Sequence, residues 1–73
     1  MERAFEHDGQ ACRIEARLED EIWHVRAMRG DKVVCTAGRV PRTHRLDAEA
    51  LGGDDPLRAM LDAYEQRIRS GQL

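Results

Sequence analysis

The sequence predicts a small α+β domain, in which a four-stranded antiparallel meander packs one face against a C-terminal amphipathic helix. Residues 11–28 contain two stretches in which apolar and charged side chains alternate, on either side of the acidic turn Glu19-Asp20-Glu21. A period of two is typical of half-buried strands. Asp8-Gly9 precedes them and favours a two-residue hairpin turn. Residues 57–68 repeat apolar side chains at helical spacing, which predicts the helix that covers the sheet.

The two central strands have a register that satisfies both faces at once. If Leu18 lies opposite Trp23 and Glu15 opposite Arg26, the apolar residues share one face and the charged residues share the other. A shift by one residue would bury the charges. The same reasoning across Asp8-Gly9 places Phe5 opposite Cys12, which makes residues 1–7 an edge strand.

The fourth strand is predicted over residues 33–39, and the sequence allows two conformations for the loop before it. A two-residue turn at Gly30-Asp31 would point Val34 and Thr36 into the core. A loop with Gly30 in the left-handed region and an adjacent bulge would instead point Val33, Cys35 and Ala37 inward. The second reading is favoured, because it keeps these residues on the face of Trp23 and Val25.

The chain is predicted to form one domain over residues 1–73, divided into the sheet at 1–40, a linker at 41–54 and the helix at 55–70. Pro41 suits the end of a strand, and residues 46–51 are expected to form a short helical turn that Asp47 caps. Asp55-Pro56 then has the chemistry of a helix start, with a carboxylate cap followed by proline. The predicted core consists of Phe5, Cys12, Ile14, Ala16, Leu18, Trp23, Val25, Ala27, Val33, Cys35, Leu57, Met60, Leu61, Tyr64 and Ile68.

Composition excludes several classes of function. Twelve basic and fourteen acidic side chains nearly cancel, so no overall field draws the chain to nucleic acid or to a membrane. No apolar run approaches the roughly 20 residues that span a bilayer, and we expect a cytoplasmic protein. Arginine outnumbers lysine strongly, which is typical of a GC-rich bacterial genome. A chain this short lacks room for a deep pocket, so no small-molecule substrate is expected.

No catalytic, cofactor or metal site is predicted. The three histidines, His7, His24 and His44, are scattered and do not have the short spacing of metal ligands. Cys12 and Cys35 both have the parity of the inner face and are expected to be buried hydrophobes too far apart for a disulfide. The protein is therefore expected not to be an enzyme.

The remaining feature is the fourth strand, because residues 33–38 carry no charge in a β-prone segment at the sheet edge. Natural edges are normally protected by charge, proline, a bulge or a cover. Either residues 41–54 cover this edge, or it pairs with another protein or with a second copy in a homodimer. The predicted contact residues are Ile22, Met28, Val33, Val34, Thr36 and Gly38. The alternative is nucleic-acid binding by a basic arm that comprises Arg39, Arg42, His44 and Arg45.

Overall fold

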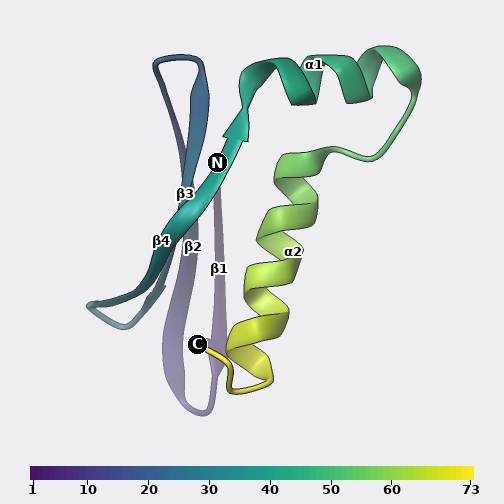
Figure 1. Cartoon of the computed structure of the whole chain (residues 1–73). Helices are drawn as coiled ribbons and strands as arrows, with labels where there is room; N and C mark the ends of the chain where they lie inside the picture. The colour runs from purple at the N-terminus through teal and green to yellow at the C-terminus, as the bar shows by residue number, and fades with distance from the viewer.

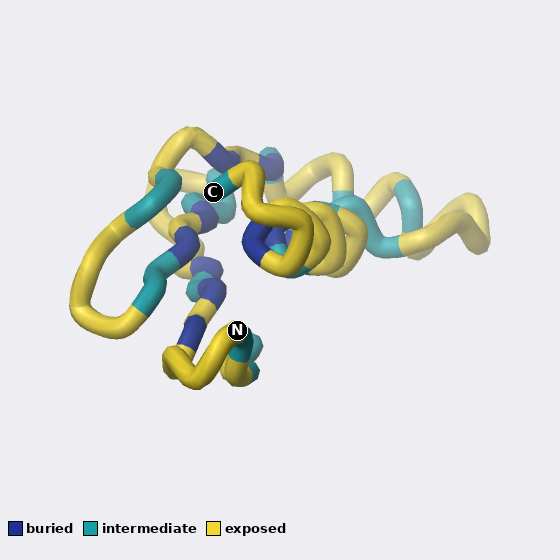
Figure 2. Tube along the Cα trace, turned by 90° about the horizontal axis from the view of Figure 1, so that it is seen from below, coloured by how far each residue is buried: buried dark blue, intermediate teal, exposed yellow.

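A computed structural model, which describes residues 1–73, confirms the α+β fold and the antiparallel sheet in the order β1-β2-β3-β4. In Figure 1 the sheet is seen from its β4 edge, and α2 runs along one of its faces. Figure 2 shows the buried residues of the strands and of α2 turned toward one another. The elements are β1 (Glu2–His7), β2 (Gln10–Glu19), β3 (Ile22–Arg29), β4 (Lys32–Pro41), α1 (Arg42–Leu51) and α2 (Pro56–Arg69).

The registers predicted for the first three strands are confirmed. Leu18 lies opposite Trp23, and Glu15 lies opposite Arg26. Phe5 lies opposite Cys12 across the first hairpin. Positive φ angles occur at both central residues of each turn, Asp8 and Gly9 in the first and Asp20 and Glu21 in the second. This is the backbone geometry that matches the twist of two-residue hairpins.

The favoured reading of the loop before β4 is confirmed for Gly30, which is left-handed with a φ of 59°, but it is wrong about the adjacent bulge and the inward positions of Val33 and Ala37. Gly30 and Asp31 form a two-residue turn, since Arg29 lies opposite Lys32. The bulges lie inside the strand instead. Val25 lies opposite Gly38 and Met28 lies opposite Val33, so β4 uses more residues than β3 over the same length of the sheet. The strand β4 therefore contains two extra residues, and each one changes which face the following side chains occupy.

These bulges change the predicted core. Of the three residues expected to point inward from β4, only Cys35 packs against the core, and Val33 is 41% exposed. Val34 packs against the core cluster, and the later positions Gly38 and Val40 are buried. Leu18 is a second correction. It is 43% exposed, because it lies near the end of the hairpin, where α1 rather than α2 is its helical neighbour.

Helix α2 forms as the sequence predicts. The Asp55 side chain accepts a hydrogen bond from the Leu57 N–H at 2.9 Å, and Pro56 occupies the first turn. This cap satisfies a backbone donor that the helix itself cannot pair. The helix buries one apolar stripe against the sheet, which consists of Leu57, Leu61, Tyr64 and Ile68.

Helix α1 is longer than predicted and lies apart from the core. It begins at Arg42, four residues before the expected helical turn, and buries none of its residues. Gly52, with a φ of 72°, ends it in the left-handed conformation. In Figure 1, α1 leaves the end of β4 and extends over the start of α2, so residues 41–54 leave the edge of β4 uncovered. Neither helix is long and apolar enough to cross a membrane.

Candidate interaction surface

The outer edge of β4 is free to pair with another strand. Ten backbone hydrogen bonds lie outside the regular helices and strands, and none of them involves residues 33–40. The segment 33–38 also lacks any charged side chain. The opposite edge, β1, presents Glu2 and Glu6 to solvent, which discourages pairing there. Of the two sheet edges, β4 is the one without charge protection in its central part.

The apolar residues on the outer face of β3 and β4 form two separate groups, and Val33 takes the place there that was predicted for Val34. Met28 and Val33 lie opposite each other at one end of the β3–β4 pair, and the Arg13 Nη2 atom lies 3.3 Å from the Met28 sulfur. Ile22 lies at the other end, opposite Pro41. Polar and charged side chains occupy the rows between them. The outer face therefore offers two small apolar contacts rather than one continuous patch.

Three further predicted contact residues differ in what they offer a partner. Thr36 is exposed on the edge. Val34 packs against the core cluster, and Gly38 is buried over Tyr64 and Met60. Gly38 can therefore contribute only its backbone to an interface.

The bulges also limit how far a partner strand could follow β4. Residues 38–41 pair with β3 in one continuous register, opposite Val25 through Ile22. Between residues 33 and 38 the extra residues bend the strand, which is one of the ways in which natural edges avoid pairing. We expect the backbone of β4 to support a short interface rather than a long one.

The predicted basic arm is largely neutralised within the chain. Arg42 donates to the Glu21 carboxylate at 2.9 Å. Arg45 donates to both oxygens of Asp55, at 2.8 and 3.1 Å, and its guanidinium lies 5.1 Å from the centre of the Trp23 ring. Arg39 and His44 are exposed. The arm therefore presents less free positive charge than its sequence suggests, which weakens the nucleic-acid alternative.

Asp55 connects the two helices, because the carboxylate that caps α2 also binds Arg45 of α1. The hydrogen bond from Arg45 is the main reason that the pKa of Asp55 lies below its usual range, and the Leu57 N–H adds to it. A lowered pKa in the folded state stabilises the fold at pH values above the ordinary pKa of aspartate, and this stability is lost as the pH falls through the folded value.

We expect Asp55→Asn to lower the free energy of unfolding by about 0.5 kcal/mol at pH 7, since asparagine caps as well as aspartate but cannot form the ion pair. The difference between variant and parent should disappear as the pH is lowered below the carboxylate range. Urea unfolding at several pH values would measure this. Asp54→Asn, at an exposed neighbour without an ion pair, is the matched control. Equal losses in the two variants would contradict the role of Arg45.

Both cysteines are free thiols. Hydrogen bonds from the Ala37 N–H and then from the Tyr64 hydroxyl lower the pKa of Cys35. Burial, followed by the contact with Cys35, raises the pKa of Tyr64 to about 12. The structure contains no group of three or more histidine, cysteine, aspartate or glutamate side chains that could hold a metal ion.

A cleft between α1 and the end of the sheet was not foreseen from the sequence. It has a volume of about 510 Å³, and its apolar walls are Leu18, Trp23 and Leu46. Leu46 is 49% exposed. The two charged pairs beside it, Arg42 with Glu21 and Arg45 with Asp55, leave it without a strong charge of either sign. The one signal in the sequence is the amphipathic pattern of residues 42–51, most of which lie in the predicted linker.

Comparison with protein-family models, with curated proteins and with solved structures gives no match.

Proposed function

We propose that the chain is a non-catalytic protein-interaction module that associates through the β4 edge, most simply with a second copy of itself. The observation that carries the proposal is that residues 33–38 form an uncovered edge segment without charge. Strand addition at such an edge satisfies backbone groups that otherwise face water. Both free thiols suit a reducing compartment, and we place the interaction in the cytoplasm.

A two-fold homodimer is the simplest form of this interaction. In an antiparallel pair of β4 strands the two-fold axis passes between the two strands, so each copy presents the same surface to the other. The net charge of −2 is small and sets up little repulsion between copies. Val33, which is 41% exposed beside Met28, supplies an apolar contact at one end of the interface.

The bulges set the strength of this association. Because they bend β4 over residues 33–38, two edges can follow one another over only a few residues. A short interface of this kind belongs among weak and transient contacts. We therefore expect a reversible dimer with a dissociation constant in the micromolar range, rather than an obligate dimer.

We expect Ala37→Lys to weaken the dimer at least about tenfold, since the two-fold axis would bring two added charges close together across a pairing edge. Ala37 is exposed on β4, so the substitution leaves the core intact. Sedimentation equilibrium over a range of protein concentrations would measure the dissociation constant. Circular dichroism would establish that the variant is folded.

Ala4→Lys is the matched control, because Ala4 is an exposed alanine on β1, at the other edge of the same sheet. Both variants have the same net charge, so a general effect of charge would weaken both dimers equally. Weakening confined to Ala37→Lys supports the β4 interface. A parent protein that remains monomeric at millimolar concentration would rule out the homodimer.

A further inference from the structure

The outer face of the sheet carries a row of three basic side chains. Arg17 lies opposite His24 across the β2–β3 pair, and His24 lies opposite Arg39 across the β3–β4 pair. Residues in direct register on neighbouring strands share a face and lie about 5 Å apart. The three side chains therefore form a line across the sheet, on the face that α2 does not cover.

The row is not neutralised as the other arginines of this face are. Arg13 and Arg26 both bind the Glu15 carboxylate, at 2.8 and 3.1 Å. Arg17 has only a contact of 3.7 Å with Glu19, and both of these side chains are mostly exposed. Arg39 makes no ion pair and is exposed. Arg17 and Arg39 are therefore the two arginines of this face whose charge is least neutralised within the chain, which leaves them free to bind an anion.

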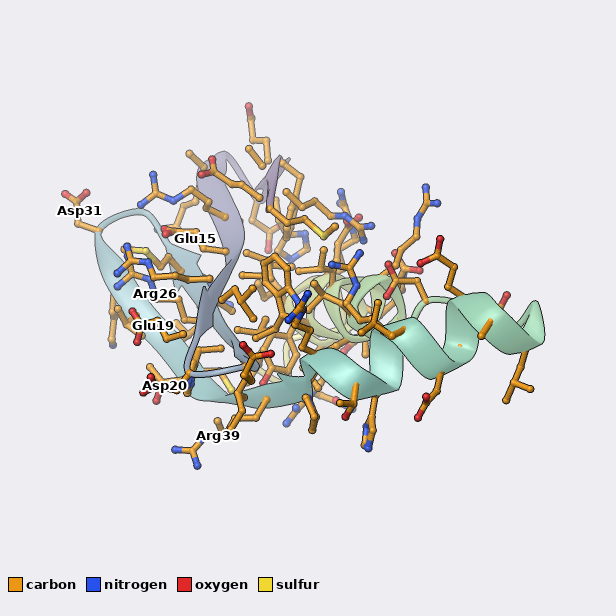
Figure 3. The ribbon with its side chains drawn as sticks, turned by 90° about the horizontal axis from the view of Figure 1, so that it is seen from above. Glu15, Glu19, Asp20, Arg26, Asp31 and Arg39 are labelled. Atoms are coloured by element: carbon orange, nitrogen blue, oxygen red, sulfur yellow. The ribbon has the colours of Figure 1, made fainter.

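A shallow hollow of about 190 Å³ lies beside Arg17 and His24, and Arg39 is not part of its lining. Its polar lining includes Arg17, His24 and the Thr36 side chain at the β4 bulge. Arg26 also lines it, and in Figure 3 Arg26 and Glu15 lie close together on the side of the sheet away from α2. Glu15 is held as a carboxylate, because hydrogen bonding from Arg26 lowers its pKa. Glu19 is the second acid in the lining and the one acidic partner that Arg17 has.

Acidic side chains bound the row on two sides. Glu19, Asp20 and Glu21 lie at the β2–β3 turn, and Asp31 lies at the β3–β4 turn. Figure 3 shows Asp31 and Asp20 at separate ends of this face, with Arg39 projecting away from both helices. An extended polyanion laid along the strands would meet these carboxylates. A compact anion centred on the row would meet only Glu19 among them.

We propose that Arg17, His24 and Arg39 form a binding site for a compact phosphate-bearing ligand, with the dimensions of a diphosphate group. The Arg17 and Arg39 backbones lie about 10 Å apart, two strand spacings, and their guanidinium groups can close on one anion from both sides. The His24 ring and the Thr36 hydroxyl supply further donors between them. The site shares Thr36 with the proposed β4 interface, but binding there does not require a dimer.

Inorganic pyrophosphate is the probe that tests the site, by isothermal titration calorimetry of the whole chain in a buffer of low ionic strength. We expect Arg17→Gln and Arg39→Gln each to weaken binding about tenfold, the effect of losing one charge-assisted contact. Neither variant should unfold measurably more easily than the parent, since both side chains are exposed and the one ion pair lost, between Arg17 and Glu19, is a weak surface contact. Thermal unfolding without ligand would establish this.

Arg58→Gln is the matched control, because Arg58 is exposed on α2, makes no side-chain ion pair and lies on a different element. Binding that is lost in the two row variants and kept in Arg58→Gln supports the site. Equal weakening in all three variants, or no heat of binding at millimolar pyrophosphate, would overturn it. A DNA or RNA duplex that binds more tightly than pyrophosphate through the same arginines would overturn the assignment of a compact ligand.

Discussion

Leu57→Ala is expected to abolish most of the stability of the fold. Leu57 is fully buried at the start of α2, two residues after the cap that Asp55 provides. Truncation of a buried leucine costs about 2–5 kcal/mol, because the lost apolar contacts leave a cavity that the neighbours fill only partly. A single core of this size supplies only about 3–5 kcal/mol of net stability. We therefore expect the variant to be largely unfolded at 25 °C.

Urea unfolding followed by the fluorescence of Trp23, the one tryptophan, would measure the loss. Leu51→Ala is the matched control, since Leu51 is 87% exposed at the end of α1. That substitution should change the free energy of unfolding by less than about 0.5 kcal/mol. A Leu57→Ala variant as stable as Leu51→Ala would mean that α2 does not hold the sheet face.

The first three strands were predictable because each side chain had one acceptable face. Glu15 and Arg26 had to remain in water, and Ile14 and Val25 had to leave it, so one register met both demands. The start of α2 was predictable for a similar reason, because the chemistry of Asp55 and Pro56 is specific to the first turn of a helix.

The strand β4 was harder to predict because several of its side chains are compatible with either face of the sheet. Val33 and Val34 are equally apolar, and Thr36 and Ala37 tolerate either side, so the sequence does not mark the two bulges. The bulges follow from long-range packing, since a two-residue turn alone would point Thr36 inward. The two bulges instead let Cys35 pack against the core and leave Gly38 and Val40 buried.

The candidate surfaces also differ in how far the sequence alone predicts them. The uncharged edge could be read from composition alone, and the structure leaves it uncovered. The ion pairs of Arg42 and Arg45 could not be read in this way, because their partners Glu21 and Asp55 approach only after α1 has formed. The basic row across Arg17 and Arg39 depends on the register of three strands, and the two bulges in β4 are what place Arg39 opposite His24.

Gly38→Ala is expected to destabilise the fold by about 1–3 kcal/mol, the cost of overpacking a close-packed site. A Cβ atom at this position would lie 2.5 Å from the Tyr64 hydroxyl oxygen, 2.8 Å from the Met60 sulfur and 2.9 Å from the Val25 Cβ. The Tyr64 ring would have to move, because the backbones of β3 and β4 are held by their ladder. Chemical denaturation of the variant and its parent would measure the cost.

Gly53→Ala is the control for a change of glycine alone, because the nearest atom to its added Cβ is 3.8 Å away. Tyr64→Phe provides a sharper test when it is combined with Gly38→Ala, since it removes the oxygen that the new methyl group meets most closely. If that contact is the cause, the double variant should lose less stability than the two single losses predict together.

Displacing Tyr64 also removes a hydrogen-bond donor from Cys35, so the pKa of that thiol should rise in Gly38→Ala. If the losses of the two single variants are additive and the pKa of Cys35 is unchanged, the destabilisation by Gly38→Ala arises elsewhere in the core.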